Sequence, residues 1–366
     1  MRLSPTLSGY FAKHFAGWVI GSFLAIMSIV SLMDFMELMR RASGVESAHL
    51  TLLLEMALLK LPHMGQEILP FAVLFGSMLA FTRLTRSNEL VVARAAGVSV
   101  WQFLMPAILV VLLIGAFKVM ALNPLSAIMI TRFHGLEEQH LEKGADSFLT
   151  VGHGGLWVRE KSGDGSEHIL HATAAHETDA ELGGVMIIRF TDGDKFIERI
   201  DAARARLENG HWKLREAVVT PASGRSTRVE RVAIETRLTL QNIKDSLAAP
   251  ESMSFWELPG FIQILESAGF SAIRHRLYFH ALLASPLLLI AMVLIAATFS
   301  MRLTRSGGTL KWAASGLFFG FLLYFVSDLV FALGLSSRIP DILAAWTPAT
   351  VTMLLGVASL LHLEDG

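Results

Sequence analysis

The sequence of 366 residues contains no cysteine. Disulfide bonds, thiolate metal ligands and cysteine nucleophiles are therefore excluded. Charged side chains are also scarce, at 17% of the residues, against roughly 25% in an average soluble domain. The formal net charge is −1, which provides no general attraction to nucleic acid. The composition thus excludes thiol chemistry and argues against a nucleic-acid partner.

Motifs of the common catalytic sites are missing as well. The sequence has no G-x-x-x-x-G-K-[ST] phosphate loop, no H-E-x-x-H and no G-x-S-x-G. We therefore expect no catalytic residue, no nucleotide hydrolysis by this chain itself, no metal and no cofactor. His168, His171 and His176 lie close together in sequence. A strand with exposed histidines explains them better than a metal site, because no carboxylate stands at a usable spacing.

Long apolar segments are abundant. Hydrophobic residues make up 53% of the chain and the mean hydropathy is +0.51. A helix needs about 20 apolar residues to cross the hydrocarbon core. The first such segment is longer than the core of a signal peptide and no small-residue cleavage site follows it, so we expect an anchor that is retained. Six segments qualify: Phe15–Met33, Pro62–Phe81, Trp101–Leu122, Leu277–Met301, Trp312–Leu335 and Ala344–Leu361.

Between the third and fourth apolar segments the composition changes. Short runs rich in β-branched and aromatic residues alternate with turn residues, and Asn209-Gly210 is a strong hairpin signal. Strands without intervening helices indicate an antiparallel sandwich, a jellyroll or a related open sheet. We predict an α-helical membrane protein with six transmembrane helices plus an inserted all-β, jellyroll-like periplasmic domain. The expected domains are 1–124 with helices one to three, 125–250 with the β domain, and 251–366 with an amphipathic connector (Ser254–Ala268) and helices four to six.

The distribution of basic residues predicts the orientation in the membrane. Four basic residues flank the apolar segments on one side: Arg40, Arg41, Lys60 and Arg338. The other side has more and is therefore assigned to the cytoplasm, together with both chain termini: Arg2, Lys13, Arg83, Arg86, Arg94, Arg302, Arg305 and Lys311. The β domain is then periplasmic.

Ionisable residues within the apolar segments are candidates for function, because they usually face a bundle interior or a cavity. For Glu67, a position facing the bundle interior or a cavity and a water-accessible position at the membrane interface are equally compatible with the sequence. For Asp328 an interfacial position is favoured, and Lys118 stands near one end of its segment, where its side chain can reach the surface. The fifth segment carries an aromatic stripe around Gly316 and Gly320 that suits a close helix contact, a lining for acyl chains or plain lipid exposure.

The stretch Arg86–Gly97, RSNELVVARAAG, lies between the second and third segments. It reads as a short helix with Ser87 able to cap its start and Gly97 at its end, or as a loop whose charges are merely solvated. This motif resembles the cytoplasmic coupling helix of the LptF/LptG family of lipopolysaccharide export permeases. The resemblance covers essentially the whole chain. Three features match the LptG branch better than the LptF branch: Tyr10–Lys13, Gly155-Leu156-Trp157, and Gly320-Phe321 with Tyr324.

This resemblance implies a function and partners. The chain would be the membrane subunit of an ABC-type exporter that extracts lipopolysaccharide from the outer leaflet of the inner membrane and passes it to a periplasmic protein bridge. It would work with an LptF-like second permease subunit, an LptB-like ATPase dimer that supplies the energy and an LptC-like bridge protein.

The resemblance also assigns roles to residues. Glu89 would contact the ATPase, within a coupling set of Arg86, Ser87, Glu89, Leu90 and Arg94. Lipid would be held by Arg40 and Arg41 through its phosphates, and by aromatic residues of the fifth segment: Phe318, Phe319, Phe321, Tyr324 and Phe325. Asp34 departs from the family pattern, since some relatives have a lysine there, and a phosphate contact at that position is therefore weakened.

Two other functions remain in view. The chain would be a membrane-anchored scaffold if its β domain bound periplasmic partners without moving lipid. Loss of the Glu89 side chain separates this alternative from the exporter, because a scaffold does not need an ATPase contact. A membrane enzyme acting on lipid is disfavoured, because the sequence offers no recognisable nucleophile and base or metal set.

Overall fold

The computed structural model describes residues 5–43, 49–87, 89, 92, 95, 97, 99–140, 147–152, 155–161, 167–176, 181–191, 195–208, 210–236, 249–267, 271–301 and 309–365. The chain divides into two compact units. One is helical and comprises Met1–Glu137, Ser254–Trp256 and Arg276–Gly366. The other contains a β-sheet and comprises Glu138–Met253 and Glu257–His275.

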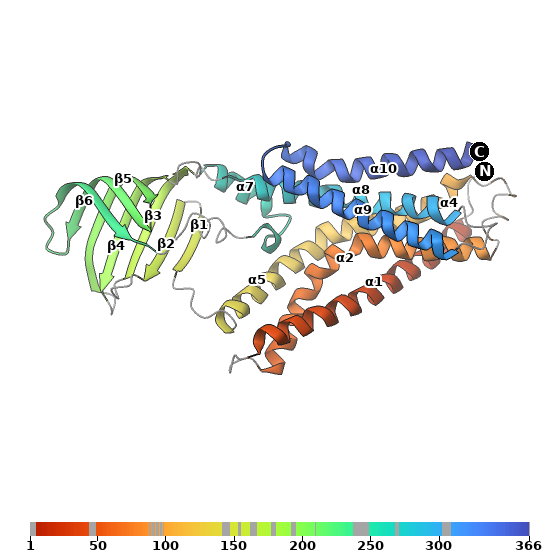
Figure 1. The fold of residues 1–366 in the computed structure, drawn as a ribbon, viewed down its shortest axis with the longest axis horizontal. Helices are drawn as coiled ribbons and strands as arrows, with labels where there is room; N and C mark the ends of the chain where they lie inside the picture. Colours follow the sequence, from red (N-terminus) through yellow and green to blue (C-terminus); the bar gives the residue numbers. More distant parts are fainter. Residues whose placement is uncertain are drawn as a thin grey trace. The chain divides into compact units, whose positions relative to one another are not determined.

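The helical unit confirms the six long apolar helices. Among the described residues, six helices are long and apolar enough to cross a membrane, and Val100–Glu137 counts as a single span. The helices are α1 (Pro5–Ala42), α2 (Leu50–Arg86), α4 (Val100–Phe117), the π-helical η1 (Lys118–Leu122), α5 (Asn123–His140), α8 (Ile273–Met301), α9 (Thr309–Leu335) and α10 (Asp341–Asp365) (Figure 1).

The third span extends further than the apolar segment predicts. The sequence analysis ends that segment at Leu122, before Asn123-Pro124, whereas α5 continues the helix to His140. A proline inside a continuous helix removes one backbone hydrogen bond and usually kinks or breaks the helix. The preceding π-helical turn, η1, is a local widening that α-helices accommodate and that occurs often at functional sites. The polar residues after Pro124 therefore prolong the helix instead of ending it.

Close contact between α1 and α2 depends on a glycine. A Cβ atom added to Gly76 would lie 2.5 Å from the Cα of Val19. Any side chain at this position would push the two helices apart. Around it, buried apolar residues of α1 and α2 join those of α4, α8 and α10 in one core, which includes Phe15, Leu74 and Leu289. Small residues at such crossings are the usual means of helix association in membranes.

The β unit confirms an inserted all-β domain. Its described strands are β1 (Ser147–Gly152), β2 (Gly155–Lys161), β3 (Glu167–His176), β4 (Glu181–Thr191), β5 (Lys195–Glu208), β6 (His211–Pro221) and β7 (Thr227–Glu235). They form one seven-stranded antiparallel sheet in the order of the sequence (Figure 1). Among the arrangements that the sequence allows, this one is an up-and-down open sheet. The predicted pairing of β5 with β6 is present, with Glu208 opposite His211, and Gly210 between them has a positive φ of 73°.

One face of the sheet is apolar and buried. Alternation along the strands places the largest buried side chains on that face, for example Trp212 and Leu214 on β6. The amphipathic connector contributes to the same core, since Leu265 of α7 (Leu258–Ser267) is fully buried there. The helix begins at Leu258 and not at Ser254, whose hydroxyl accepts a hydrogen bond from the backbone N–H of Trp256.

Candidate functional site

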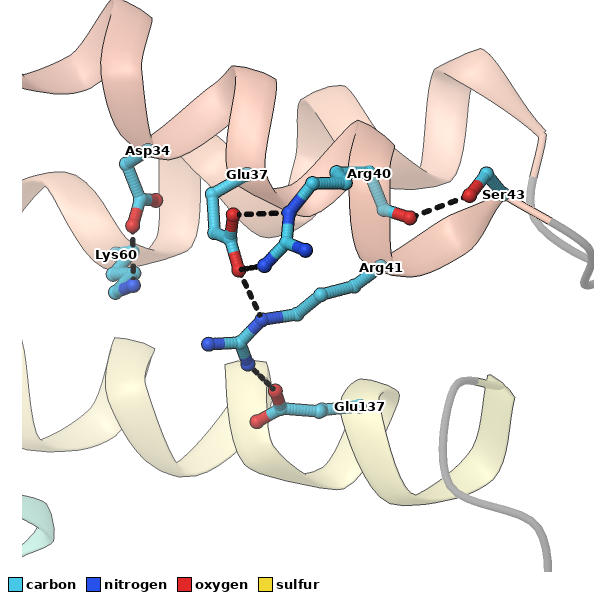
Figure 2. Close-up of polar contacts among 7 residues, drawn as sticks. All are labelled: Asp34, Glu37, Arg40, Arg41, Ser43, Lys60 and Glu137. Carbon is cyan, nitrogen blue, oxygen red and sulfur yellow. Dashed lines mark hydrogen bonds and ion pairs between the residues drawn. The ribbon is translucent and has the colours of Figure 1, made fainter.

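The predicted arginine pair lies in the last turn of α1, where Figure 2 shows both guanidinium groups turned toward the same carboxylate. Arg40 donates from Nε to Oε2 of Glu37 at 2.8 Å and from Nη2 to Oε1 at 2.7 Å. Arg41 donates from Nε to Oε1 of Glu37 at 3.2 Å. The spacing explains this arrangement, because residues three and four apart in a helix lie on one face. Cations at a helix C-terminus also interact favourably with the helix dipole.

Arg41 also connects α1 to another helix. Its Nη1 donates to Oε1 of Glu137 on α5 at 3.4 Å (Figure 2). The side chains of Arg40 and Arg41 remain 76% and 58% exposed. Exposed ion pairs of this kind contribute little to stability, because water solvates both groups when they separate. We call Glu37, Arg40, Arg41 and Glu137 the arginine cluster; its two guanidinium groups are accessible, whereas the Glu137 side chain is 18% exposed.

Asp34, the position that departs from the family pattern, has a counter-charge from α2. Lys60 Nζ donates to Oδ1 of Asp34 at 2.5 Å, and the same ammonium group lies 5.5 Å from the centre of the Phe133 ring on α5. A further ion pair joins α5 to α2, where Arg132 Nη2 donates to Oε1 of Glu55 at 2.9 Å. Ionic contacts thus link α1, α2 and α5 to one another.

The aromatic stripe of α9 divides into an exposed group and one half-buried member. Phe318, Phe321, Tyr324 and Phe325 are each more than half exposed. Phe319 instead packs on the helical core, with its ring centre 5.7 Å from that of Phe299. The structure therefore brings together four of the five predicted aromatic residues and separates Phe319 from them.

The glycines of the same helix hold it against α2. A Cβ atom at Gly316 or at Gly320 would collide with the side chain of Met78 or Leu74, respectively. Phe71 of α2 lies beside the aromatic stripe, with ring-centre distances of 5.8 Å to Phe321 and 5.3 Å to Tyr324. The predicted close helix contact is thus present within this chain, and the exposed aromatic side chains lie at its margin.

The stretch after α2 is described at residues 86, 87, 89, 92, 95 and 97. Glu89, Val92 and Ala95 have helical backbone, and Gly97 has a φ of 82°, as expected of a glycine that ends a helix. Ser87 is the C-cap of α2, and its hydroxyl donates to Oε1 of Glu89 at 2.9 Å. Arg86 is the last residue of α2. Leu90 and Arg94, which we also assigned to ATPase coupling, lie outside the described residues.

Two ionisable residues of the apolar segments, Lys118 and Glu67, differ in their exposure. Lys118 was expected to reach the surface, but it is only 9% exposed, at the first position of η1. This expectation was wrong because the helix continues beyond Lys118 and keeps it inside the bundle. Glu67 is exposed instead, with Oε1 lying 3.5 Å from Nε2 of His63 one turn earlier.

The histidines of the β unit differ from the expected exposed row. His168 is 1% exposed, and its Nε2 lies 3.3 Å from Oε2 of Glu160, which is 2% exposed. The hydroxyl of Thr236 donates to the same carboxylate oxygen at 2.6 Å. His171 packs against Trp157 with ring centres 4.2 Å apart. Within the described part of the chain, no group of three or more potential metal ligands comes together. We call Glu160, His168 and Thr236 the buried triad; it is a structural tie.

Sequence reasoning missed the partners of the arginine pair. Glu37 was detectable, because a carboxylate three and four residues before two arginines in a helix forms ion pairs with them. Glu137 and Lys60 were not detectable, because they lie 96 and 26 residues from the groups they contact. Only the packing of α1 against α2 and α5 brings these charges together.

Comparisons with known proteins agree with this architecture. Residues 9–362 match the family described as "Lipopolysaccharide export system permease LptF/LptG". The LptG protein of Escherichia coli strain K12 is 24% identical and is aligned over 99% of both chains. The LptG protein of Haemophilus influenzae is 22% identical over 96% of both chains. The match extends across all six apolar helices and the inserted sheet. The chain therefore belongs to the LptF/LptG family of lipopolysaccharide export system permeases.

Proposed function

We propose that this protein is an LptG-type membrane subunit of an ABC-type exporter that takes lipopolysaccharide from the outer leaflet of the inner membrane. The observation that carries the proposal is the family match over residues 9–362, which includes both the membrane helices and the inserted β-sheet. The named relatives are both lipopolysaccharide export permeases of the LptG type. The chain would pass the lipid to an LptC-like periplasmic bridge, pair with an LptF-like subunit and receive energy from an LptB-like ATPase dimer.

The distribution of charge supports one orientation. Basic residues concentrate at the ends of α2 and α8–α9 that adjoin residues 83–97 and 302–311. By the positive-inside rule these ends are cytoplasmic. The coupling stretch and both chain termini then face the cytoplasm. The C-terminal end of α1 and the β unit face the periplasm, where the arginine cluster lies at the level of the lipid head groups.

The proposed roles of the arginines and of the aromatic residues in lipid binding follow from the chemistry of their side chains. The guanidinium groups of Arg40 and Arg41 match phosphate oxygens with paired N–H donors. The exposed aromatic side chains of α9, such as Phe318 and Phe325, offer apolar area to acyl chains, at about 0.8 kcal/mol per buried methylene. We keep residues 1–124, 125–250 and 251–366 as the functional divisions of the chain.

Glu89 is the proposed contact with the ATPase. Its carboxylate accepts a hydrogen bond from Ser87 at 2.9 Å, which orients it next to the end of α2. A charge-assisted hydrogen bond to an arginine of the ATPase would contribute about 1.5–3 kcal/mol. Because Ser87 caps α2, movement of the ATPase at Glu89 would be transmitted directly to a membrane helix.

Co-purification tests the proposal. The tagged wild-type chain and a Glu89→Ala variant are extracted from membranes, and their partners and ATPase rates are determined. We expect an ATPase and a second permease subunit with the wild type, and loss of ATPase binding or of lipid-coupled turnover with the variant. If the wild type retains periplasmic partners but no ATPase, the scaffold function replaces the exporter.

A further inference from the structure

Three N–H groups of the arginine cluster converge on one carboxylate. Nε and Nη2 of Arg40 and Nε of Arg41 donate to the two oxygens of Glu37 at 2.8, 2.7 and 3.2 Å (Figure 2). Carboxylate and phosphate oxygens fit the same planar arrangement of guanidinium donors. Glu37 therefore occupies the donors that a phosphate monoester would use if it bound both arginines at once.

The remaining contact of Arg41 strengthens this conclusion. Its Nη1 donates to Glu137 at 3.4 Å, so that both edges of this guanidinium group are engaged by carboxylates. Arg40 keeps one edge that is not turned toward Glu37. A phosphate at that edge alone would leave the cluster unchanged, whereas a phosphate shared by the two arginines has to displace Glu37 and compete with Glu137.

We propose that Glu37 is an internal competitor for the phosphate of the transported lipid, and that it lowers the affinity of the Arg40–Arg41 pair so that bound lipid is released again. This inference rests on the proposed function, because it takes lipid phosphate as the ligand. Glu37 is thus a residue that sets affinity and specificity, although it makes no contact with lipid itself. A phosphate that also competes with Glu137 for Arg41 would weaken the contact of this arginine with α5.

The exposure of the cluster permits such an exchange. Glu37 is 39% exposed and both arginines are more exposed still. Exposed ion pairs are weak enough to be replaced by another anion. The neighbouring pair of Asp34 and Lys60, which joins α1 to α2, is less accessible, at 16% and 29% exposure. Removal of an exposed competing charge should change an equilibrium constant by about threefold to fivefold.

The test uses the whole complex in nanodiscs, with its permease partner and ATPase. Lipid-stimulated ATPase activity is titrated with lipopolysaccharide, with the same lipid after enzymatic removal of its phosphates, and with inorganic phosphate. We expect Glu37→Gln to lower the half-saturating concentration of phosphorylated lipid about threefold to fivefold. The response to dephosphorylated lipid should not change, and inorganic phosphate should not stimulate either protein.

Glu55→Gln is the matched control. Glu55 pairs with Arg132 across α2 and α5 at 2.9 Å, and its loss removes the same charge from the same helical unit. This variant should titrate like the wild type with every ligand. If Glu55→Gln and Glu37→Gln lower the half-saturating concentration of phosphorylated lipid equally, the effect is one of general charge and the inference is overturned.

A second variant keeps the inference testable if Glu37→Gln fails to assemble. Glu137→Gln frees only the Nη1 edge of Arg41 and should tighten binding of phosphorylated lipid by a smaller factor. Unchanged or weaker binding in both variants overturns the inference and leaves the proposed function intact. If the variants respond at lower concentrations to inorganic phosphate alone, the site binds free phosphate, which would also overturn the inference. A wild-type complex that responds to neither lipid would contradict the proposed function itself.

Discussion

Two polar clusters of this protein combine carboxylates with basic side chains, and their burial differs completely. In the arginine cluster at the end of α1, both guanidinium groups are more than half exposed. In the buried triad of the β-sheet, Glu160, His168 and Thr236 are all at most 5% exposed. The groups are chemically alike, and their accessibility to water decides what each cluster can do.

The difference has an energetic basis. Exposed pairs are solvated when they separate, so that their loss costs about 1 kcal/mol or less. A buried group that loses its partner keeps its desolvation penalty, and breaking a buried pair costs about 3–5 kcal/mol. The arginine cluster is therefore suited to exchange one anion for another, and the buried triad is suited to hold strands together.

Substitution of Glu160 should have the largest effect on stability. Glu160→Ala removes the acceptor of Thr236 and the neighbour of His168, and we expect it to destabilise the β unit by about 3 kcal/mol. Urea unfolding of the full-length protein in detergent would show this through the fluorine resonance of fluorotryptophan-labelled Trp212, which is buried in that unit.

Thr236→Val is the matched control, since it removes one hydrogen bond and leaves the Glu160–His168 contact. Its expected cost is about 1 kcal/mol. If Glu160→Ala proves no more costly than Thr236→Val, the buried triad does not act as a structural tie.

For the helical unit, the sequence predicts the membrane helices and part of the arginine cluster. Six membrane-spanning segments follow from the length of the apolar runs alone, and the arginine pair is visible in the sequence as Arg40-Arg41. Glu37 is also accessible to local reasoning, because helical spacing places it beside both arginines. Glu137 and Lys60 are not, since their contacts arise only when distant helices pack. The extension of the third span beyond Pro124 was missed because a proline inside a helix usually ends or kinks it, and the π-helical turn that precedes Pro124 in the structure has no signature in the sequence.

In the β unit, the sequence predicts the positions of the strands better than it predicts which face of the sheet each residue occupies. The strand residues and the Asn209-Gly210 hairpin follow from residue type and turn chemistry. The burial of His168 does not, because a period of two identifies alternate residues without stating which set faces the core. The pairing of β2 with β3 places Glu160 opposite His168, and that register decides the matter.

The contact between Arg41 and Glu137 should respond to salt, unlike the buried triad. Glu137→Gln should destabilise the helical unit by less than about 1 kcal/mol. The contact itself should loosen in about 1 M salt, where the screening length falls to about 3 Å. Because the chain has no cysteine, spin labels placed at Met39→Cys and Gly135→Cys would report the α1–α5 distance alone.

We expect a broader distance distribution in high salt and in Glu137→Gln at low salt. Glu55→Gln serves as the control, because its charge lies on another ion pair of α5. A distribution that salt and the Glu137→Gln substitution leave unchanged would show that apolar packing alone fixes the distance between α1 and α5.

The smallest effect is expected at the exposed ion pair beside the β5–β6 hairpin. Lys213 Nζ donates to Oε2 of Glu208 at 2.7 Å. This hydrogen bond lowers the pKa of Glu208 below its ordinary value. A carboxylate whose pKa is lower in the folded state adds stability above its unfolded pKa, and this stability is lost as the pH falls through the folded pKa. Glu208→Gln should therefore destabilise the β unit slightly at neutral pH, and the difference from the wild type should vanish in acid.

Urea titrations at several pH values, read from the resonance of Trp212, would measure this difference. Glu230→Gln on β7 removes the same charge from an exposed strand position and controls for net charge. Equal pH profiles for the two variants would show that the contact with Lys213 adds nothing beyond charge. A difference that grows in acid would contradict the sign of the pKa shift.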